Sequence, residues 1–402
     1  MAPDLNPSEV VHSVPEIERA LARIWAVAAG PRGGDGERHV AARSSVLNLV
    51  VVAGRRETAE RCAATIEATA GRHPSRSLIL SSMDLEGRPS LDATVQTVAV
   101  DLGAGIAQTG AETIYVTVHG ATGHHLASII VPLLVHDLPV ALWWPRDPQF
   151  RSHRADRLLP IADRLIVDGS SWSGDGLDRL SEMARMTQGR PMVVADFALL
   201  RQARWREALA SVYDLPDLRP HLRAVRSIKV EFAAREEGDP GGLTNIVRPV
   251  YHVAWLASRL GMPVVEPMHR GPDGRRTATL RQGTHTVAVE WRPVRSELDE
   301  GSTVRVEIVS RLRGAELVGN VAAGDRSVDV AIHDKGRERV RRTYPAPRLG
   351  DVELLERALE DTASDAVAGE VLAMAGRLIS AEPTSRRTDD ATNRRQTQEP
   401  RP

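Results

Sequence analysis

The chain has 402 residues, of which 42% are hydrophobic and 26% are charged, a composition typical of ordinary globular proteins. This length exceeds that of one typical domain and predicts two domains with flanking segments. The formal net charge of −1 gives no overall field that would attract nucleic acid or an anionic membrane, which argues against both as partners.

Residues 1–43 are predicted to hold one helix and a linker. Residues 1–14 are expected to be flexible, and they lack the basic and apolar segments of a secretory signal, so a cytoplasmic protein is expected. Residues 15–29 carry apolar side chains at helical spacing, with Pro15 suited to a first helical turn. The stretch PRGGDGER that follows is typical of a linker.

Residues 44–215 are predicted to form an α/β domain. The apolar run VLNLVVVA at 46–53, a helical stretch at 57–70 and a second apolar run at 77–82 are typical of a βαβ unit in a parallel sheet. Further strands are expected at 93–100, 113–120, 140–144 and 164–169, and further helices at 124–134, 152–161, 177–187 and 199–214. This alternation predicts a Rossmann-like, doubly wound arrangement that the last of these helices closes.

Residues 220–380 are predicted to form an α+β domain after the proline-broken segment 215–223. A strand at 227–234 and a helix at 243–261 precede several alternating segments joined by tight turns, which favours a mostly antiparallel sheet. Residues 351–380 are expected to supply C-terminal helices that cover the apolar face of this sheet. The tail 381–402 almost lacks apolar residues and is predicted to be disordered.

No cofactor, metal or catalytic site is evident in the sequence. The turn Gly103–Gly105 begins a dinucleotide fingerprint, but Gln108 stands where the third glycine belongs. The three histidines within 119–125 have no third metal ligand at useful spacing. A single cysteine, Cys62, excludes an intrachain disulfide and an all-cysteine zinc site. We therefore expect no cofactor, no metal and no catalytic residues.

Small residues follow three of the predicted strands where each strand ends, at Gly54–Arg56, Gly120–Gly123 and Asp168–Ser171. Doubly wound sheets bind ligands at the carboxyl ends of their strands, where backbone amides can approach an anion and arginines can neutralise it. Any α/β fold also needs glycine and serine at such turns. A small-anion site in this crevice and ordinary turn chemistry both remain open.

Two adjacent tryptophans, Trp143 and Trp144, stand in a chain whose aromatic content is only 3%. Neighbouring residues of a strand point to opposite faces of the sheet. One indole is expected in the core. The other is predicted to contact a helix, a ligand or a protein partner, since tryptophan is enriched at interface hot spots.

Five segments occur in a characteristic order and spacing: VLNLVVVA, GRHPSRSLIL, LDATVQT, HLASIIVPLLVHDLPVALWW and ADRLIVDGSSW. Together they resemble the glucose-6-phosphate dehydrogenase assembly family, OpcA, over about residues 46–214 and more weakly over the second domain. The resemblance implies a non-catalytic assembly factor or allosteric activator that binds glucose-6-phosphate dehydrogenase and promotes the oxidative pentose phosphate pathway. The family has no established catalytic residue or cofactor to carry over.

The matching segments nominate seven residues for partner contact or for structure: Arg76, His125, Asp137, Trp143, Trp144, Asp163 and Asp168. Two departures from the family pattern stand out. The family's indole ahead of Trp205 is replaced in the segment 196–199, and no cysteine precedes Glu112, which limits thiol control to an intermolecular reaction of Cys62. The alternative function is a sugar-phosphate or nucleotide sensor, or a cryptic sugar-phosphate enzyme, that uses the strand-end crevice.

Overall fold

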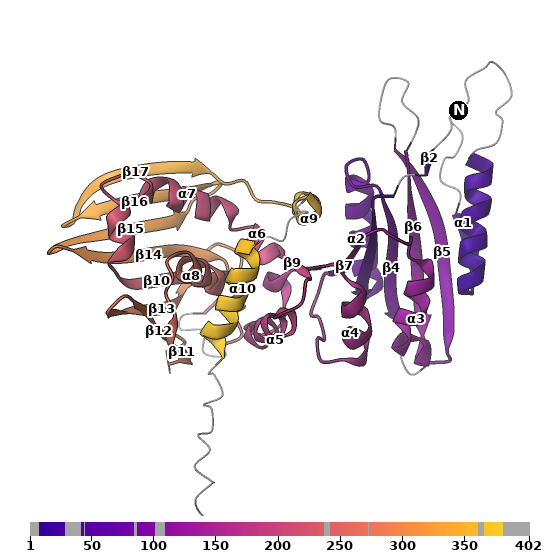
Figure 1. Cartoon of the computed structure of the whole chain (residues 1–402), viewed down its shortest axis with the longest axis horizontal. Coiled ribbons are helices and arrows are strands. Elements are labelled where there is room, and N and C mark those ends of the chain that lie inside the picture. The colour runs from indigo at the N-terminus through magenta and orange to yellow at the C-terminus, as the bar shows by residue number, and fades with distance from the viewer. Residues whose placement is uncertain are drawn as a thin grey trace, which may run out of the picture.

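A computed structural model describes most of the chain, namely residues 8–28, 42–43, 45–83, 87–100, 109–236, 242–271, 273–360 and 366–380. The fold is mixed α/β with two large sheets and helices, as the sequence predicts. The two sheets lie at opposite ends of the long axis, with α5, α6, α9 and α10 between them (Figure 1). The predicted linker PRGGDGER at 31–38, the Gly103–Gly105 turn and the tail from 381 lie outside the described residues.

The first sheet has nine strands, and its main path runs in this order: β1 (Ser8–Val11), β5 (Ser90–Val100), β6 (Thr109–His119), β4 (Ser75–Met83), β3 (Leu47–Gly54), β7 (Val140–Trp144), β8 (Arg164–Val167) and β9 (Val193–Asp196). The short β2 (Ala42–Arg43) pairs with β6. From β6 to β9 every pair is parallel. Strand β3 is buried along almost its whole length, as expected of a central parallel strand with both faces covered.

The N-terminal residues 8–11 form a strand, so the prediction that 1–14 are unpaired is wrong there. Strand β1 pairs antiparallel with β5, and β5 pairs antiparallel with β6. An edge strand such as β5 would otherwise expose a row of unpaired backbone groups. Val11 of β1 is buried against the sheet together with Ile17 of the helix α1 (Val14–Ala28).

Each face of the first sheet is covered by a different set of helices. One face packs against α2 (Arg56–Thr69) and α9 (Asp351–Glu360). The other face packs against the remaining helices of this part of the chain: α1, α3 (Leu126–Ile130), α4 (His153–Leu158) and α5 (Leu177–Thr187). Both faces are therefore buried.

Helix α9 corrects one prediction, because we expected it to cover the second sheet. Its side chains Leu354 and Leu355 are fully buried in the cluster that also holds Leu49 and Trp143 of the first sheet. Right-handed crossovers place α4 and α5 on the opposite face, which leaves the area beside α2 to be covered from elsewhere in the chain.

The second sheet has eight strands, in this order: β11 (Val264–Arg270), β12 (Arg276–Gln282), β13 (His285–Arg295), β10 (Val225–Ala234), β14 (Thr303–Leu312), β15 (Ala315–Ala323), β16 (Ser327–Asp334) and β17 (Arg337–Pro345). Every pair is antiparallel except β10 with β13, which is parallel. One face packs against α7 (Ala203–Tyr213) and α8 (Val247–Arg259). On the other face, alternate residues stay half-buried or exposed.

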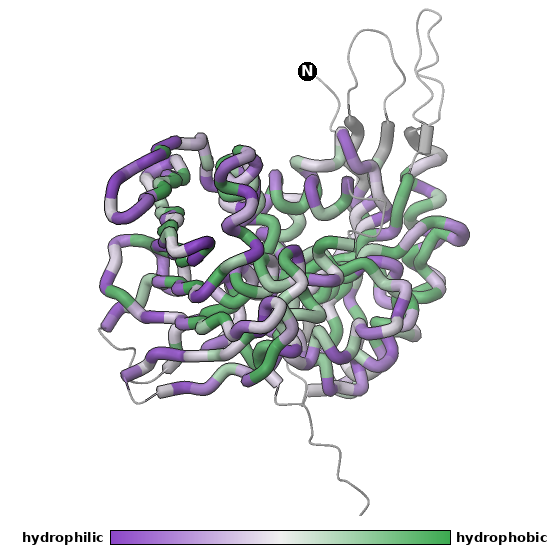
Figure 2. The backbone as a smooth tube through the Cα atoms, turned by 60° about the vertical axis from the view of Figure 1, so that its left-hand side comes forward, coloured by the Kyte–Doolittle hydropathy of each residue, from purple (hydrophilic) through white to green (hydrophobic). Residues whose placement is uncertain are grey.

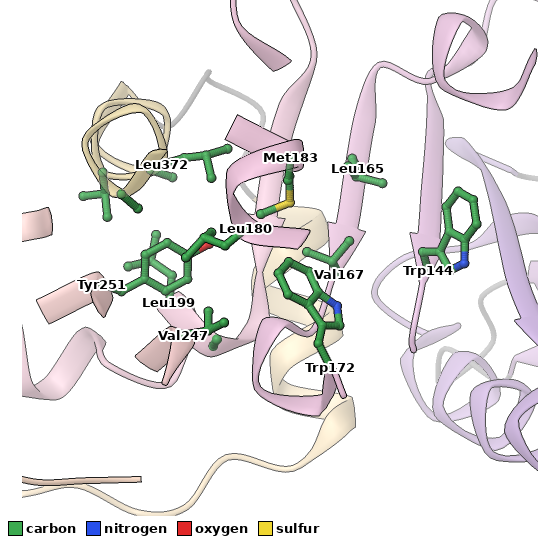
Figure 3. Close-up of a cluster of buried hydrophobic side chains, with 14 of the residues drawn as sticks. Trp144, Leu165, Val167, Trp172, Leu180, Met183, Leu199, Val247, Tyr251 and Leu372 are labelled. Carbon is green, nitrogen blue, oxygen red and sulfur yellow. The ribbon is translucent and has the colours of Figure 1, made fainter. Parts of the chain in front are cut away.

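The predicted helix at 199–214 is split into α6 (Phe197–Leu200) and α7, and α7 contacts β16 and β17 instead of closing the first sheet. Helix α10 (Ala366–Ile379) packs against α5 and α8. Tyr251 of α8 and Leu372 of α10 thus join Leu180 and Met183 of α5 in one apolar cluster (Figure 3). Figure 2 shows the hydrophobic stretches gathered through the middle of the molecule. None of the described helices has the length and apolarity needed to cross a membrane.

Candidate functional site

Arg76 is the centre of a buried ion-pair cluster and is not exposed for partner contact. Its Nε donates to Glu112 at 2.6 Å, and one terminal nitrogen donates to Glu18 at 3.0 Å and to the Leu133 carbonyl at 2.7 Å. Trp25 donates from its indole nitrogen to the other carboxylate oxygen of Glu112 at 2.6 Å. The cluster ties α1 to β4 and β6, so the role of Arg76 is structural.

Both tryptophans of β7 are buried, so of the three alternatives left open for the second indole (a helix, a ligand or a protein partner) the structure agrees with packing inside the helix-covered fold. Trp143 is 2% exposed and lies 6.1 Å from Phe197 between ring centroids, on the face covered by α2 and α9. Trp144 is 5% exposed and packs edge-on against Phe150 at 6.2 Å on the other face. The alternation of faces is as predicted, but helices cover both faces.

His125, Asp137 and Asp163 are exposed. His125 precedes the first residue of α3 and is exposed. Asp137 occupies the turn before β7 with φ of 65°, a conformation that aspartate tolerates better than most residues. Asp163 accepts a hydrogen bond from the Val140 amide at 2.8 Å and so fixes the start of β7.

Asp168 lies at the carboxyl end of β8, where its carboxylate is occupied by protein donors. Arg201 binds it through two nitrogens at 2.8 and 3.0 Å, and the Ser170 hydroxyl donates to it at 2.6 Å. The Ser170 amide also donates to Asp168, at 3.1 Å. At this one of the three strand-end turns, the Ser170 amide that we expected to face an anion is therefore occupied by a protein carboxylate.

Asp196 organises the junction between the two sheets. Its Oδ1 accepts from the Gly169 and Ala198 amides, both at 2.8 Å, and its Oδ2 accepts from the Tyr251 hydroxyl at 2.7 Å. Burial raises the pKa of this carboxyl to about 6. We did not single out Asp196, although an aspartate between a strand and a helix is a common N-cap signal.

A cavity of about 260 Å³ opens beside this junction. It is lined from the N-terminal turn of α7, from α8, from α9 and from loops of the second sheet, and the lining includes the arginines Arg201, Arg204, Arg248, Arg348 and Arg357. Sequence reasoning missed this site because its residues come from segments far apart in the chain. One signal was available, since Arg248 stands between Val247 and Pro249 in the largely buried first turn of α8.

Cys62 lies on α2 and is 1% exposed. Burial raises the pKa of its thiol to about 12, so the reactive thiolate is scarce at neutral pH. The intermolecular reaction of Cys62 that the sequence left open is therefore disfavoured.

Two family models match the chain one after the other. The first describes the N-terminal domain of the glucose-6-phosphate dehydrogenase subunit, and it matches residues 66–185. The second describes the C-terminal domain of the same subunit, and it matches residues 192–372. Together they take in strands β4 to β17 of the two sheets, while β1, β2 and β3 precede the first match.

Two cyanobacterial proteins that carry the name OpcA are similar in sequence. The protein from Synechocystis is 28% identical over 148 residues, which are 36% of this chain and 29% of the relative. The protein from Synechococcus elongatus is 26% identical over 136 residues, 34% of this chain and 28% of the relative. The match thus spans less than a third of each relative's length.

Among solved structures, the WlbA dehydrogenase of Thermus thermophilus is similar, with a TM-score of 0.41 and 9% identity over 85% of this chain and 97% of that one. The dehydrogenase MviM of Clostridium difficile has a TM-score of 0.37 and 14% identity over 59% of this chain and 76% of that one. Both are weak overall similarities.

Proposed function

Because this chain belongs to the OpcA family of glucose-6-phosphate dehydrogenase subunits, we propose that it is a non-catalytic assembly factor that binds and activates that enzyme. The observation that carries the proposal is the consecutive match to the two halves of the family. Such a protein would promote the oxidative pentose phosphate pathway. We further propose a cytoplasmic location, and a division into domains at 44–215 and 220–380.

The turn after β3 supports a role without dinucleotide chemistry. In doubly wound sheets with this strand order, the pyrophosphate lies on a glycine-rich turn after the first strand. Here Gly54 is followed by Arg55 and Arg56, and Arg56 pairs with Glu60 along the outside of α2. A turn of this kind offers one glycine where the fingerprint needs three.

Activation requires that the chain bind one state of the enzyme better than another. Mixing the purified chain with the dehydrogenase of the same organism should give a complex that co-elutes in size-exclusion chromatography. The KM for glucose 6-phosphate should fall, or kcat should rise, by at least about fivefold, the lower end of usual allosteric coupling. The proposal is wrong if no complex forms at micromolar concentrations and if the KM for glucose 6-phosphate and the kcat of the dehydrogenase stay unchanged.

We place the contact on a ridge formed by α3 and the turn that follows it, the α3 ridge. Its residues are all exposed: His125, Ser128, Val131, Pro132, His136 and Asp137. Val131 is 45% exposed, which is unusual for a large apolar side chain in the described part of the chain. The ridge lies within the first family match and holds two of the residues nominated from the sequence.

Two single variants, Val131→Asp and Asp137→Gly, should each weaken the complex by at least about tenfold without unfolding the chain. Val131→Asp places a charge in the apolar centre of the ridge, and Asp137→Gly keeps the positive φ while it removes the carboxylate. Calorimetric titration against the dehydrogenase measures the affinity. Val265→Asp, at an exposed valine of β11, is the matched control. If Val131→Asp and the control Val265→Asp lose the same affinity, the contact does not lie on the α3 ridge, although the complex itself would still exist.

A further inference from the structure

The arginine-lined cavity does not belong to the α3 ridge and takes no part in the proposed docking. Its walls come from both sides of the junction between the sheets, including Arg357 of α9, which covers the first sheet, and Ser302 and Thr303 at the start of β14 in the second sheet. A ligand held there would contact both parts at once.

Four buried polar atoms on side chains that line the cavity have no hydrogen-bond partner among the described residues: Arg248 Nε, His252 Nε2, Thr303 Oγ1 and Gln202 Oε1. Buried polar groups in folded proteins are almost always satisfied, because each unpaired group costs free energy. Their concentration around one cavity indicates that its natural content is polar.

Arg248 makes the interior of this cavity cationic. Its terminal nitrogens donate to Ser302 Oγ at 2.9 Å and Ser170 Oγ at 3.3 Å, but no carboxylate of the described residues lies within ion-pair distance. Burial lowers the pKa of its guanidinium, which nevertheless stays charged at neutral pH. A buried cation without a paired anion is costly, and a bound anion would remove that cost.

The other lining arginines differ in how their charge is paired. Arg201 and Arg204 are paired with Asp168 and Glu207, each through a nitrogen–oxygen distance below 3 Å. Arg357 has no ion-pair partner among the residues that the structure describes. The lining carboxylates of Asp299 and Asp325 are both exposed.

The groups around the cavity bind an anion better than they perform a reaction. Burial lowers the pKa of His252 to about 3, so this imidazole is neutral and a poor proton acceptor. A guanidinium fork beside serine and threonine hydroxyls is suited to the several oxygens of a phosphate. The volume of about 260 Å³ lies below the roughly 300–1,000 Å³ usual for drug-sized ligands, which favours a small ester over a nucleotide.

We propose that this cavity binds a small phosphate ester, with Arg248 as the central cation and Ser302 and Thr303 as hydroxyl partners. Binding at this site does not require glucose-6-phosphate dehydrogenase, so this proposal and the proposed function are tested by separate experiments. Since its walls join the two sheets, an occupied site would stabilise their present arrangement.

Titration of the full chain with inorganic phosphate, glycerol 3-phosphate and ribose 5-phosphate tests the site. We expect saturable binding by calorimetry and a rise in melting temperature that grows with ligand concentration. Arg248→Gln should weaken binding by at least about tenfold, and Thr303→Val by a smaller factor. Arg226→Gln, at an exposed arginine near the end of β10 opposite to the residue that pairs with Thr303, should bind like the unchanged chain.

Succinate and sodium chloride at matched ionic strength complete the experiment. The assignment is overturned if no phosphate compound binds, if Arg248→Gln binds as well as Arg226→Gln, or if sodium chloride gives the same shift. Binding of succinate as tight as that of the phosphate esters would overturn the phosphate class. Calorimetry is read on each variant below its own melting temperature, so a less stable Arg248→Gln protein still gives an affinity.

Discussion

Replacing Asp196 by alanine should lower the free energy of unfolding by about 3–5 kcal/mol, because three donors lose their acceptor at once. The Gly169 amide, the Ala198 amide and the Tyr251 hydroxyl all donate to this carboxylate at 2.7–2.8 Å, and the residue is 3% exposed. Each buried donor left unpaired costs about 1–3 kcal/mol. Urea unfolding followed by circular dichroism measures the loss.

Asp196→Asn is the matched control. The amide oxygen can still accept from the two backbone groups, and the amide nitrogen can donate to the Tyr251 oxygen after its hydroxyl rotates. The loss should therefore be below about 2 kcal/mol. If alanine and asparagine cost the same, the hydrogen bonds at Asp196 are not what holds the junction together.

The same pair of proteins separates charge from hydrogen bonding through pH. Burial raises the folded-state pKa of Asp196 from 3.8 to about 6, so the folded chain holds this proton more tightly than the unfolded chain. The stability that comes from this pKa difference, about 3 kcal/mol, is fully present below the unfolded-state pKa of 3.8. It is lost as pH rises through the folded-state pKa of about 6. The asparagine variant should lack this component, and identical pH profiles for the two proteins would contradict the pKa shift.

Much of the first sheet could be predicted because its strands are continuous apolar runs separated by helices. VLNLVVVA can be stable only where both faces are covered, and the structure places it as β3 at the centre. The pairing of β10 with β13 could not be predicted, since alternation shows which face a strand buries but not its neighbour. The position of helix α9 could not be predicted either, because an amphipathic pattern does not show which of two sheets a helix covers.

The candidate site depended even more on tertiary structure. The apolar pattern around Trp143 and Trp144 gave the correct faces, yet only the helices packed on both sides decide that neither indole is exposed. Arg248 and Thr303 are over fifty residues apart and meet at one cavity through the fold alone. Asp168 was nominated for its position at a strand end, and its partner Arg201 comes from beyond the next strand.

Replacing Arg76 by leucine should cost about 3–5 kcal/mol of stability, because it removes the buried cation that pairs with the buried Glu112 carboxylate. Glu112 is fully buried, and the Arg76 side chain is only 4% exposed. The change also removes the hydrogen bond to the Leu133 carbonyl and the pair with Glu18. Unfolding in urea, followed through tryptophan fluorescence, measures the effect.

Arg72→Leu provides the matched control, because Arg72 lies four residues away and pairs with Glu356 at 2.9 Å while 69% exposed. An exposed pair contributes about 0–1 kcal/mol, so this variant should unfold almost like the unchanged chain. Adding Glu112→Leu to Arg76→Leu should recover part of the loss, since the buried carboxylate that Arg76 paired with is then gone as well. Equal losses for Arg72→Leu and Arg76→Leu would show that burial of the ion pair does not determine its cost.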